Sequence, residues 1–102
     1  MIIPPWAAAQ TDDWWKAYSG LNLRGGKIEF ISDDDEDMIT IHYEDGMLID
    51  VGRYDVDHRY CITVVSSDDE HGWGAPLAVS CSDDKRDLPA KIQEAIFKFR
   101  PM

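Results

Sequence analysis

The sequence predicts an α+β fold: an antiparallel meander sheet of four to five strands, with an N-terminal and a C-terminal helix packed on one face. Three observations support this prediction. The chain has 102 residues and is 44% hydrophobic, which suits one core and a single domain over residues 1–102. Short segments that alternate apolar and polar residues follow one another between residues 27 and 81. Apolar residues at helical spacing occur near the two ends.

The first helix is expected to start at Thr11, whose side chain can cap free backbone N–H groups. The acids at 12–13 would then lie near the positive end of the helix dipole, and Gly20 offers a stop. Adjacent helical residues diverge by about 100°, so Trp14 and Trp15 cannot both face the core. One of the two tryptophans is therefore expected to be partly exposed.

Five segments have strand character, and turn residues separate them. They are expected at 27–32, 38–43, 47–54, 59–65 and 77–81. Asp45 and Gly46 form the two-residue signal of a tight hairpin between the second and third strands. The run 33–37 reads as a solvated hairpin tip because neighbouring carboxylates repel each other, and 66–74 reads as a long loop.

The closing helix is expected over residues 87–99. Asp87 is the predicted cap, and Pro89 falls in the first turn, where its missing N–H has no intrahelical partner to lose. The predicted apolar stripe consists of Leu88, Ile92, Ala95, Ile96 and Phe99.

Charge and composition narrow the classes of partner and the location. Ten basic and twenty acidic residues give a formal charge of -10, which disfavours nucleic acid and anionic membranes and favours a basic partner. Residues 1–9 lack the positive charge of a signal peptide, and no stretch approaches the roughly 20 apolar residues of a membrane span. The expected location is the cytoplasm. Cys61 and Cys81 are accordingly expected to be unpaired core residues and not a disulfide.

Motifs for catalysis or metal binding are not found. The run 33–37 lacks the order of an EF-hand loop, and His42, His58 and His71 lack the short ligand spacings of zinc sites. Neither a Walker loop nor a nucleophile elbow occurs. The sequence therefore predicts no enzyme, no catalytic residue, no metal and no cofactor, although a cysteine–histidine pair brought together in space stays open.

Two acidic segments and one tryptophan are the candidate binding residues. Trp73 lies between glycines in an acidic loop, so its ring either folds back on the sheet edge or serves as an aromatic anchor for a basic surface. Opposite potentials speed encounter, and buried aromatic rings hold a complex together. The predicted partner-binding residues are Asp33, Asp34, Asp35, Glu36, Asp37, Asp68, Asp69, Glu70 and Trp73.

The second half of the chain gives a further indication of function. It contains Ile49-Asp50-Val51-Gly52-Arg53-Tyr54, then the strand 60–65, the loop with Trp73 and Pro76, and the closing helix 87–99. In these features the chain resembles the small immunity proteins of bacterial contact-dependent growth inhibition and related polymorphic toxin systems. The resemblance implies a cytoplasmic protein, a monomer or weak homodimer, that binds and neutralises one cognate toxin domain, commonly a nuclease with a basic cleft.

Two other functions fit the composition. The first is an acidic accessory or nucleic-acid-mimic protein that targets a DNA-binding enzyme, and the second is a small hydrolase. The neighbouring gene discriminates among the three, because an immunity gene is expected directly downstream of a large toxin gene.

Overall fold

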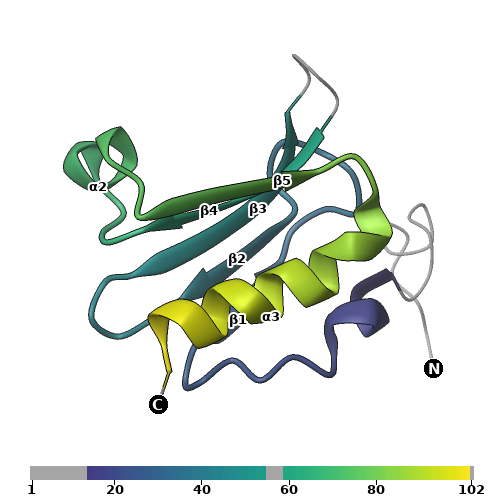
Figure 1. Ribbon diagram of the computed structural model, residues 1–102, viewed down its shortest axis with the longest axis horizontal. Helices are drawn as coiled ribbons and strands as arrows, with labels where there is room; N and C mark the ends of the chain where they lie inside the picture. Colours follow the sequence, from purple (N-terminus) through teal and green to yellow (C-terminus); the bar gives the residue numbers. More distant parts are fainter. Residues whose placement is uncertain (1–13, 55–58, 102) are drawn as a thin grey trace.

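The computed structural model describes residues 14–54 and 59–101. These residues form one five-stranded antiparallel sheet whose strands follow the order of the chain, β1-β2-β3-β4-β5 (Figure 1). The predicted meander is confirmed. The elements are the 3-10 helix η1 (Trp14–Tyr18), β1 (Lys27–Phe30), β2 (Ile39–His42), β3 (Leu48–Tyr54), β4 (Arg59–Val65), the short helix α2 (Glu70–Gly74), β5 (Ala78–Ser82), the 3-10 helix η2 (Lys85–Asp87) and α3 (Leu88–Phe99).

The strand bounds agree with the alternation in the sequence to within one or two residues, which is the usual uncertainty of element ends. The Asp-Gly hairpin between β2 and β3 is also confirmed. Gly46 has a φ of +97°, which glycine adopts without steric penalty. The Asp45 carboxylate accepts a hydrogen bond from the backbone N–H of Met47 (3.1 Å). This turn sets the register in which Ile41 lies opposite Ile49.

The hydrophobic core lies between the sheet and α3, which crosses one face (Figure 1). Along α3, Leu88, Ile92 and Ile96 are each 0% exposed. They pack against inward-facing strand residues such as Ile49 and Ile62, which are 0% and 1% exposed. The predicted apolar stripe of the closing helix is therefore confirmed.

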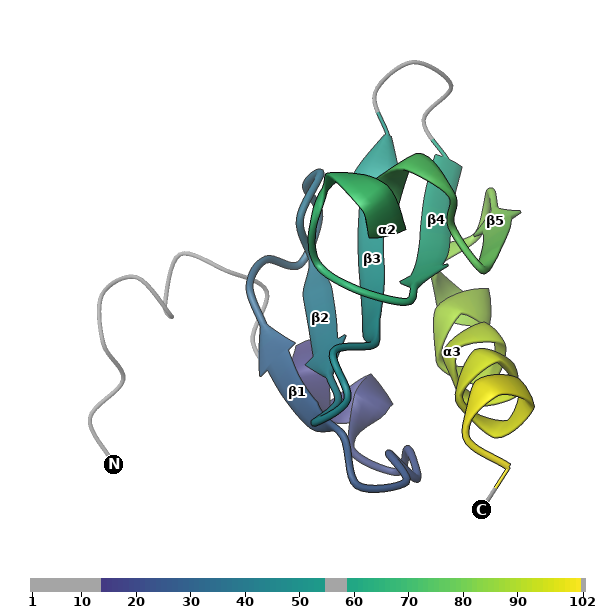
Figure 2. The same cartoon turned by 90° about the vertical axis from the view of Figure 1, so that its left-hand side faces the viewer.

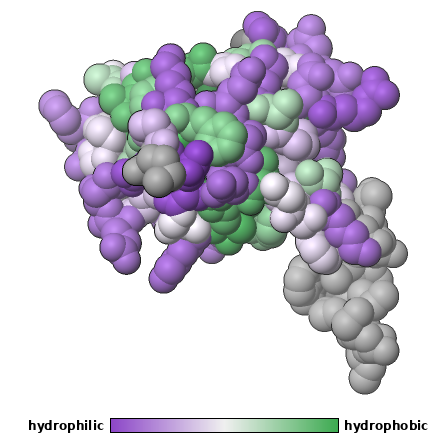
Figure 3. Space-filling view, turned by 60° about the horizontal axis from the view of Figure 1, so that its bottom comes forward, coloured by the Kyte–Doolittle hydropathy of each residue, from purple (hydrophilic) through white to green (hydrophobic). Residues whose placement is uncertain are grey.

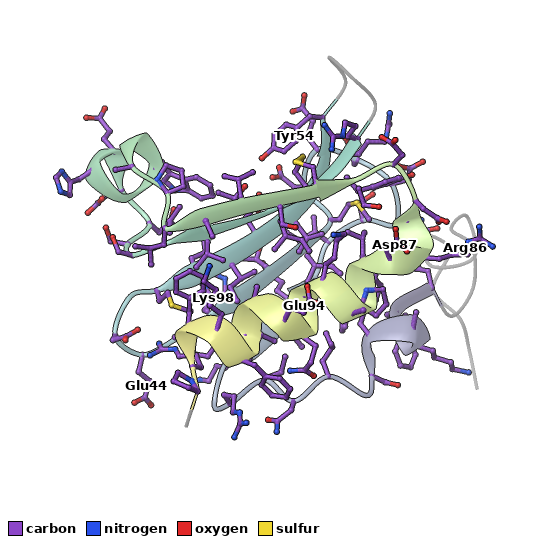
Figure 4. The ribbon with its side chains drawn as sticks, viewed as in Figure 1. Glu44, Tyr54, Arg86, Asp87, Glu94 and Lys98 are labelled. Atoms are coloured by element: carbon purple, nitrogen blue, oxygen red, sulfur yellow. A yellow bond between two sulfur atoms is a disulfide. The ribbon has the colours of Figure 1, made fainter. Side chains whose placement is uncertain are left out.

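Polar residues occupy the outer side of α3, as an amphipathic helix requires. Glu94 and Lys98 are exposed and lie on the side away from the sheet (Figure 4). Neither residue contributes to the core, so both suit control substitutions.

Asp87 is at the N-cap position of α3, as predicted, but its side chain does not make the expected capping hydrogen bond. Its backbone angles are helical. Its carboxylate accepts instead from the Ser82 hydroxyl (2.8 Å). Asp84 is the residue that caps, because its side chain accepts from the backbone N–H of Arg86 (2.9 Å) at the start of η2. A 3-10 turn in front of α3 therefore places the side-chain cap three residues upstream of the predicted one.

The predicted N-terminal α-helix is not confirmed. Thr11, Asp12 and Asp13 lie outside the described residues, and the part of the segment that is described forms only the 3-10 helix η1. The two tryptophans of η1 do separate as predicted. Trp14 packs edge-on against Phe30, with ring centroids 5.6 Å apart, whereas Trp15 is 44% exposed.

The prediction of unpaired cysteines is also wrong. Cys61 in β4 and Cys81 in β5 lie opposite each other in the register and form a disulfide. The expectation of free thiols relied on the absence of a secretory signal, which says nothing about distance. Register decides distance, and directly opposite residues of an antiparallel pair are close enough for two cysteines to bond.

Candidate functional site

The face of the sheet opposite α3, called the far face below, carries a row of residues across all five strands. The register places Glu29, Thr40, Asp50, Thr63 and Val79 side by side. Asp50 is in the centre of this row, on the central strand β3, and its side chain is half-buried. Thr40 and Thr63 beside it are only 8% and 6% exposed. Other parts of the chain therefore cover much of the far face.

One of these parts is the first acidic segment, residues 33–37, which joins β1 to β2. The backbone N–H of Arg53 donates to the carbonyl of Asp35 (2.8 Å), so the segment is attached to β3. A β-carbon at Gly52 would lie 1.8 Å from the carbonyl oxygen of Glu36. The segment does connect two strands as predicted, but it folds against the sheet and is not a freely solvated tip.

Two carboxylates of the first acidic segment have structural partners within the chain. Asp34 accepts from the Arg53 guanidinium (Nε to Oδ1, 2.7 Å) and from the Tyr60 hydroxyl (3.3 Å). Asp33 pairs with Lys85 in η2. These predicted partner-binding residues hold the segment in place, because each ties it to another element of the fold.

The last three residues of the segment have a different role. The Asp35 carboxylate accepts from the backbone N–H of Glu36 (2.7 Å), which stabilises the turn locally. Glu36 and Asp37 are exposed. Asp34 and Asp35 are exposed too, but Arg53 offsets the charge of Asp34, so the net negative charge that the segment displays comes mainly from its last three residues.

The second acidic segment, residues 68–70, lies between β4 and β5, where the sequence predicted only a loop. It leads into the short helix α2, and Asp69 is its cap. The Asp69 carboxylate accepts from the backbone N–H of Gly72 (2.8 Å) and from the Ser67 hydroxyl (2.9 Å). These hydrogen bonds stabilise the ionised form and lower the pKa of Asp69. In Figure 2, α2 lies in front of the sheet and well apart from α3.

Trp73 is held by a hydrogen bond within its own loop and is partly exposed. Its indole N–H donates to the Asp68 carboxylate (2.8 Å), which fixes the ring orientation. The side chain is nevertheless 37% exposed, and Glu70 beside it in α2 is also exposed. An amphipathic ring held by a hydrogen bond and still accessible is suited to contact a partner.

The charges of both acidic segments affect the ionisation of Asp50 on the far face. Burial, and to a smaller extent the charges of Asp37 and Asp68, together raise the pKa of Asp50 to about 6. Carboxylates from segments far apart in sequence are therefore close enough to repel the same group. Asp50 was not among the predicted site residues. The signal available for it was a single acid on the polar side of an otherwise apolar strand.

This environment makes stability depend on pH. The folded pKa of Asp50, about 6, lies above the ordinary value of 3.8, so the folded state holds its proton more tightly than the unfolded state. Asp50 is therefore destabilising above pH 6, and this destabilisation disappears as the pH falls toward 4. Asp50→Asn is expected to raise the free energy of unfolding at pH 8 by about 2 kcal/mol, with a much smaller gain at pH 4.

Urea denaturation of wild type and Asp50→Asn at the two pH values measures this difference. Glu94→Gln on the outer side of α3 is the matched control, for which we expect the same small effect at both pH values. An equal gain for Asp50→Asn at pH 8 and pH 4 would mean that the folded state does not raise the pKa of Asp50.

The two histidines among the described residues lie apart from each other. His42 and His71 are exposed on different elements, and His58 lies outside the described residues. Within residues 14–54 and 59–101, no three histidine, cysteine or acidic side chains are grouped so that they could hold a metal ion. No helix in the same residues has the length and apolar character to cross a bilayer.

A groove of about 420 Å³ beside the end of α3 is lined by Arg24, Phe99, Arg100 and Pro101. Its cation Arg100 already donates to Asp45 (2.8 Å) and lies over the ring of Tyr43, 4.2 Å from the centroid. Figure 3, which brings the lower side of Figure 1 forward, shows hydrophobic residues at the surface among hydrophilic ones. The groove therefore differs in character from the acidic far face.

The chain was compared with protein families, with curated proteins and with solved structures. No family model, curated protein or solved structure matches it.

Proposed function

We propose that this protein binds a basic surface of another macromolecule through the far face and its two acidic segments, without catalysing a reaction. The observation that supports this most directly is that residues 33–37 pack against the far face at Gly52 and leave Glu36 and Asp37 exposed. Three exposed acids extend the same negative surface: Glu36, Asp37 and Glu70. A negative surface of this kind attracts and orients a positively charged partner.

The partner class follows from the resemblance to immunity proteins. The proposed partner is a cognate toxin domain with nuclease activity, because a cleft built for phosphates presents the opposite charge. Close charge pairs at such interfaces contribute about 1.5–7 kcal/mol each in favourable cases. Trp73 would supply the apolar contact at the rim of the acidic surface.

Two observations point to different cellular locations for the protein. The resemblance implies the cytoplasm, whereas the Cys61–Cys81 disulfide is typical of an oxidising compartment. In a reducing cytoplasm both residues would be thiols. Alkylation of free thiols at the moment of cell lysis, followed by mass spectrometry, distinguishes the two.

Charge reversal on the far face tests the proposed function. We expect Asp37→Lys with Glu70→Lys to weaken binding of the toxin encoded by the upstream gene by about 100-fold, because two favourable pairs become repulsive. The dependence of affinity on salt should also become shallower. Titration calorimetry at two salt concentrations measures both effects.

The control is Glu94→Lys on the outer side of α3, which adds positive charge to the opposite side of the molecule. This control should bind nearly as tightly as wild type. Unchanged affinity of the far-face variant would remove these residues from the interface. If the upstream toxin does not bind and a DNA-binding enzyme does, the nucleic-acid-mimic function replaces the immunity function.

A further inference from the structure

The two edges of the sheet differ in how they are protected. Edge strands usually carry charged residues that discourage pairing with another chain. The edge strand β1 does so, with Lys27 and Glu29 both exposed. The edge strand β5 has no charged residue, and Val79 in it is 59% exposed.

The segment leading into β5 continues this apolar edge. Leu77 is 48% exposed, and Trp73 precedes it in α2. In Figure 1, β5 lies at the outside of the sheet, and within the described residues β4 is the strand that it pairs with. The outer backbone N–H and C=O groups of β5 therefore form an accessible row next to the exposed Val79.

β5 is also held firmly in strand conformation. It pairs with β4 along its whole length, from Tyr60 opposite Ser82 to Val64 opposite Ala78. The Cys61–Cys81 disulfide joins the two strands near the Ser82 end of this register. A strand that is already ordered loses little conformational entropy when another strand pairs with it, which favours binding.

Acidic residues lie at both ends of this edge. Glu70 is exposed in α2 before β5, and the Asp83 side chain directly after β5 is 88% exposed, 3.4 Å from Arg59. Beyond them, Arg86 points away from the body of the molecule (Figure 4) and is engaged by Asp84 (2.9 Å). The excess of negative charge favours a strand that is flanked by lysine or arginine.

We infer that β5 is the docking edge for the partner: an extended, basic-flanked strand of the partner pairs with it and continues the sheet. This inference rests on the proposed function and specifies its binding mode. Backbone hydrogen bonds would supply affinity, and the exposed Val79 and Leu77 would contact alternate side chains of the added strand. A second copy of this chain fits less well, because each copy has a formal charge of -10 and two copies repel.

A synthetic peptide of alternating valine and threonine, flanked by lysine pairs, is a direct probe. The control peptide has the same sequence with alternate amides N-methylated, so that it keeps its charge but cannot pair with β5. We expect the unmodified peptide to bind at least about tenfold more tightly, since several backbone hydrogen bonds are lost in the other. Hydrogen exchange should show slower exchange of β5 amides only with the unmodified peptide.

Substitutions on the two edges provide the second measurement. Val79→Lys should weaken binding of the unmodified peptide by about tenfold, whereas Val79→Thr, which keeps strand propensity, should not. Ile31→Lys is the matched control, because Ile31 is 44% exposed and follows the opposite edge strand. It adds the same charge but should leave binding nearly unchanged.

The outcomes separate the binding mode from the proposed function. If both peptides bind equally and β5 amides exchange as in the free protein, the docking edge is refuted while an acidic binding surface stands. If neither the peptides nor the upstream toxin bind, both proposals fail. If β5 becomes protected with rising protein concentration alone, and ultracentrifugation shows a dimer, a second copy is the occupant and the inference is overturned.

Discussion

Gly52→Ala is expected to lower the free energy of unfolding by about 3 kcal/mol, because the new methyl group has no space. Its carbon would lie 1.8 Å from the carbonyl oxygen of Glu36, which is backbone and cannot rotate away. The first acidic segment would have to move off the sheet. That movement would stretch the hydrogen bond from Arg53 N–H to the Asp35 carbonyl (2.8 Å) as well. Urea denaturation measures the loss of stability.

Gly20→Ala is the matched control, since a β-carbon there has nothing within 4 Å. It should change stability by at most a few tenths of a kcal/mol, with roughly the small gain expected when alanine replaces glycine without strain. Hydrogen exchange adds a local readout, because displacement of the acidic segment should expose the amide of Arg53. A Gly52→Ala protein as stable as wild type would show that residues 33–37 are not packed against β3.

Loss of the Cys61–Cys81 disulfide is the second large effect. The two cysteines are 20 residues apart in sequence, and a cross-link over a loop of this size restricts the unfolded chain. We expect Cys61→Ser with Cys81→Ser to lower the free energy of unfolding by about 3 kcal/mol. Most of the local change should be in β5, which is an edge strand with β4 on one side only.

Thermal denaturation with and without dithiothreitol measures the same quantity in the natural sequence. Reductant should destabilise wild type and leave the double serine variant unchanged. Two alkylated thiols in the unreduced purified protein would contradict the disulfide. The result also bears on binding, because a loosened β5 should pair less well with an added strand.

The parts of the fold that were predicted correctly depend on local pattern. The β-branched and aromatic residues of 59–65 predict β4, and the spacing of Leu88, Ile92 and Ile96 predicts the buried side of α3. The Asp45-Gly46 pair predicts its hairpin for a similar reason, because glycine tolerates the positive φ that the turn requires. In each case a few neighbouring residues are enough to specify the element.

The site was predicted only in part. Trp73 and the acidic segments were identified from composition, but composition could not show which of the carboxylates pair with cations of the same chain. Asp33 and Asp34 bond to Lys85 and Arg53, which are distant in sequence, while Glu36 and Asp37 remain exposed. Neighbouring acids in one run thus differ in role because only some of them meet a cation when the chain folds.

The sequence by itself determined the α+β class, the strand order, the amphipathic closing helix and the negative charge, because periodicity, turn chemistry and formal charge are properties of short segments. Only the tertiary structure decided that Cys61 meets Cys81, that Glu36 lies over Gly52, and that Asp37 and Asp68 both act on Asp50. These contacts depend on register and on how loops fold back across the sheet. A shift of one residue in register would turn the side chain of Asp50 or Cys61 to the other face of the sheet.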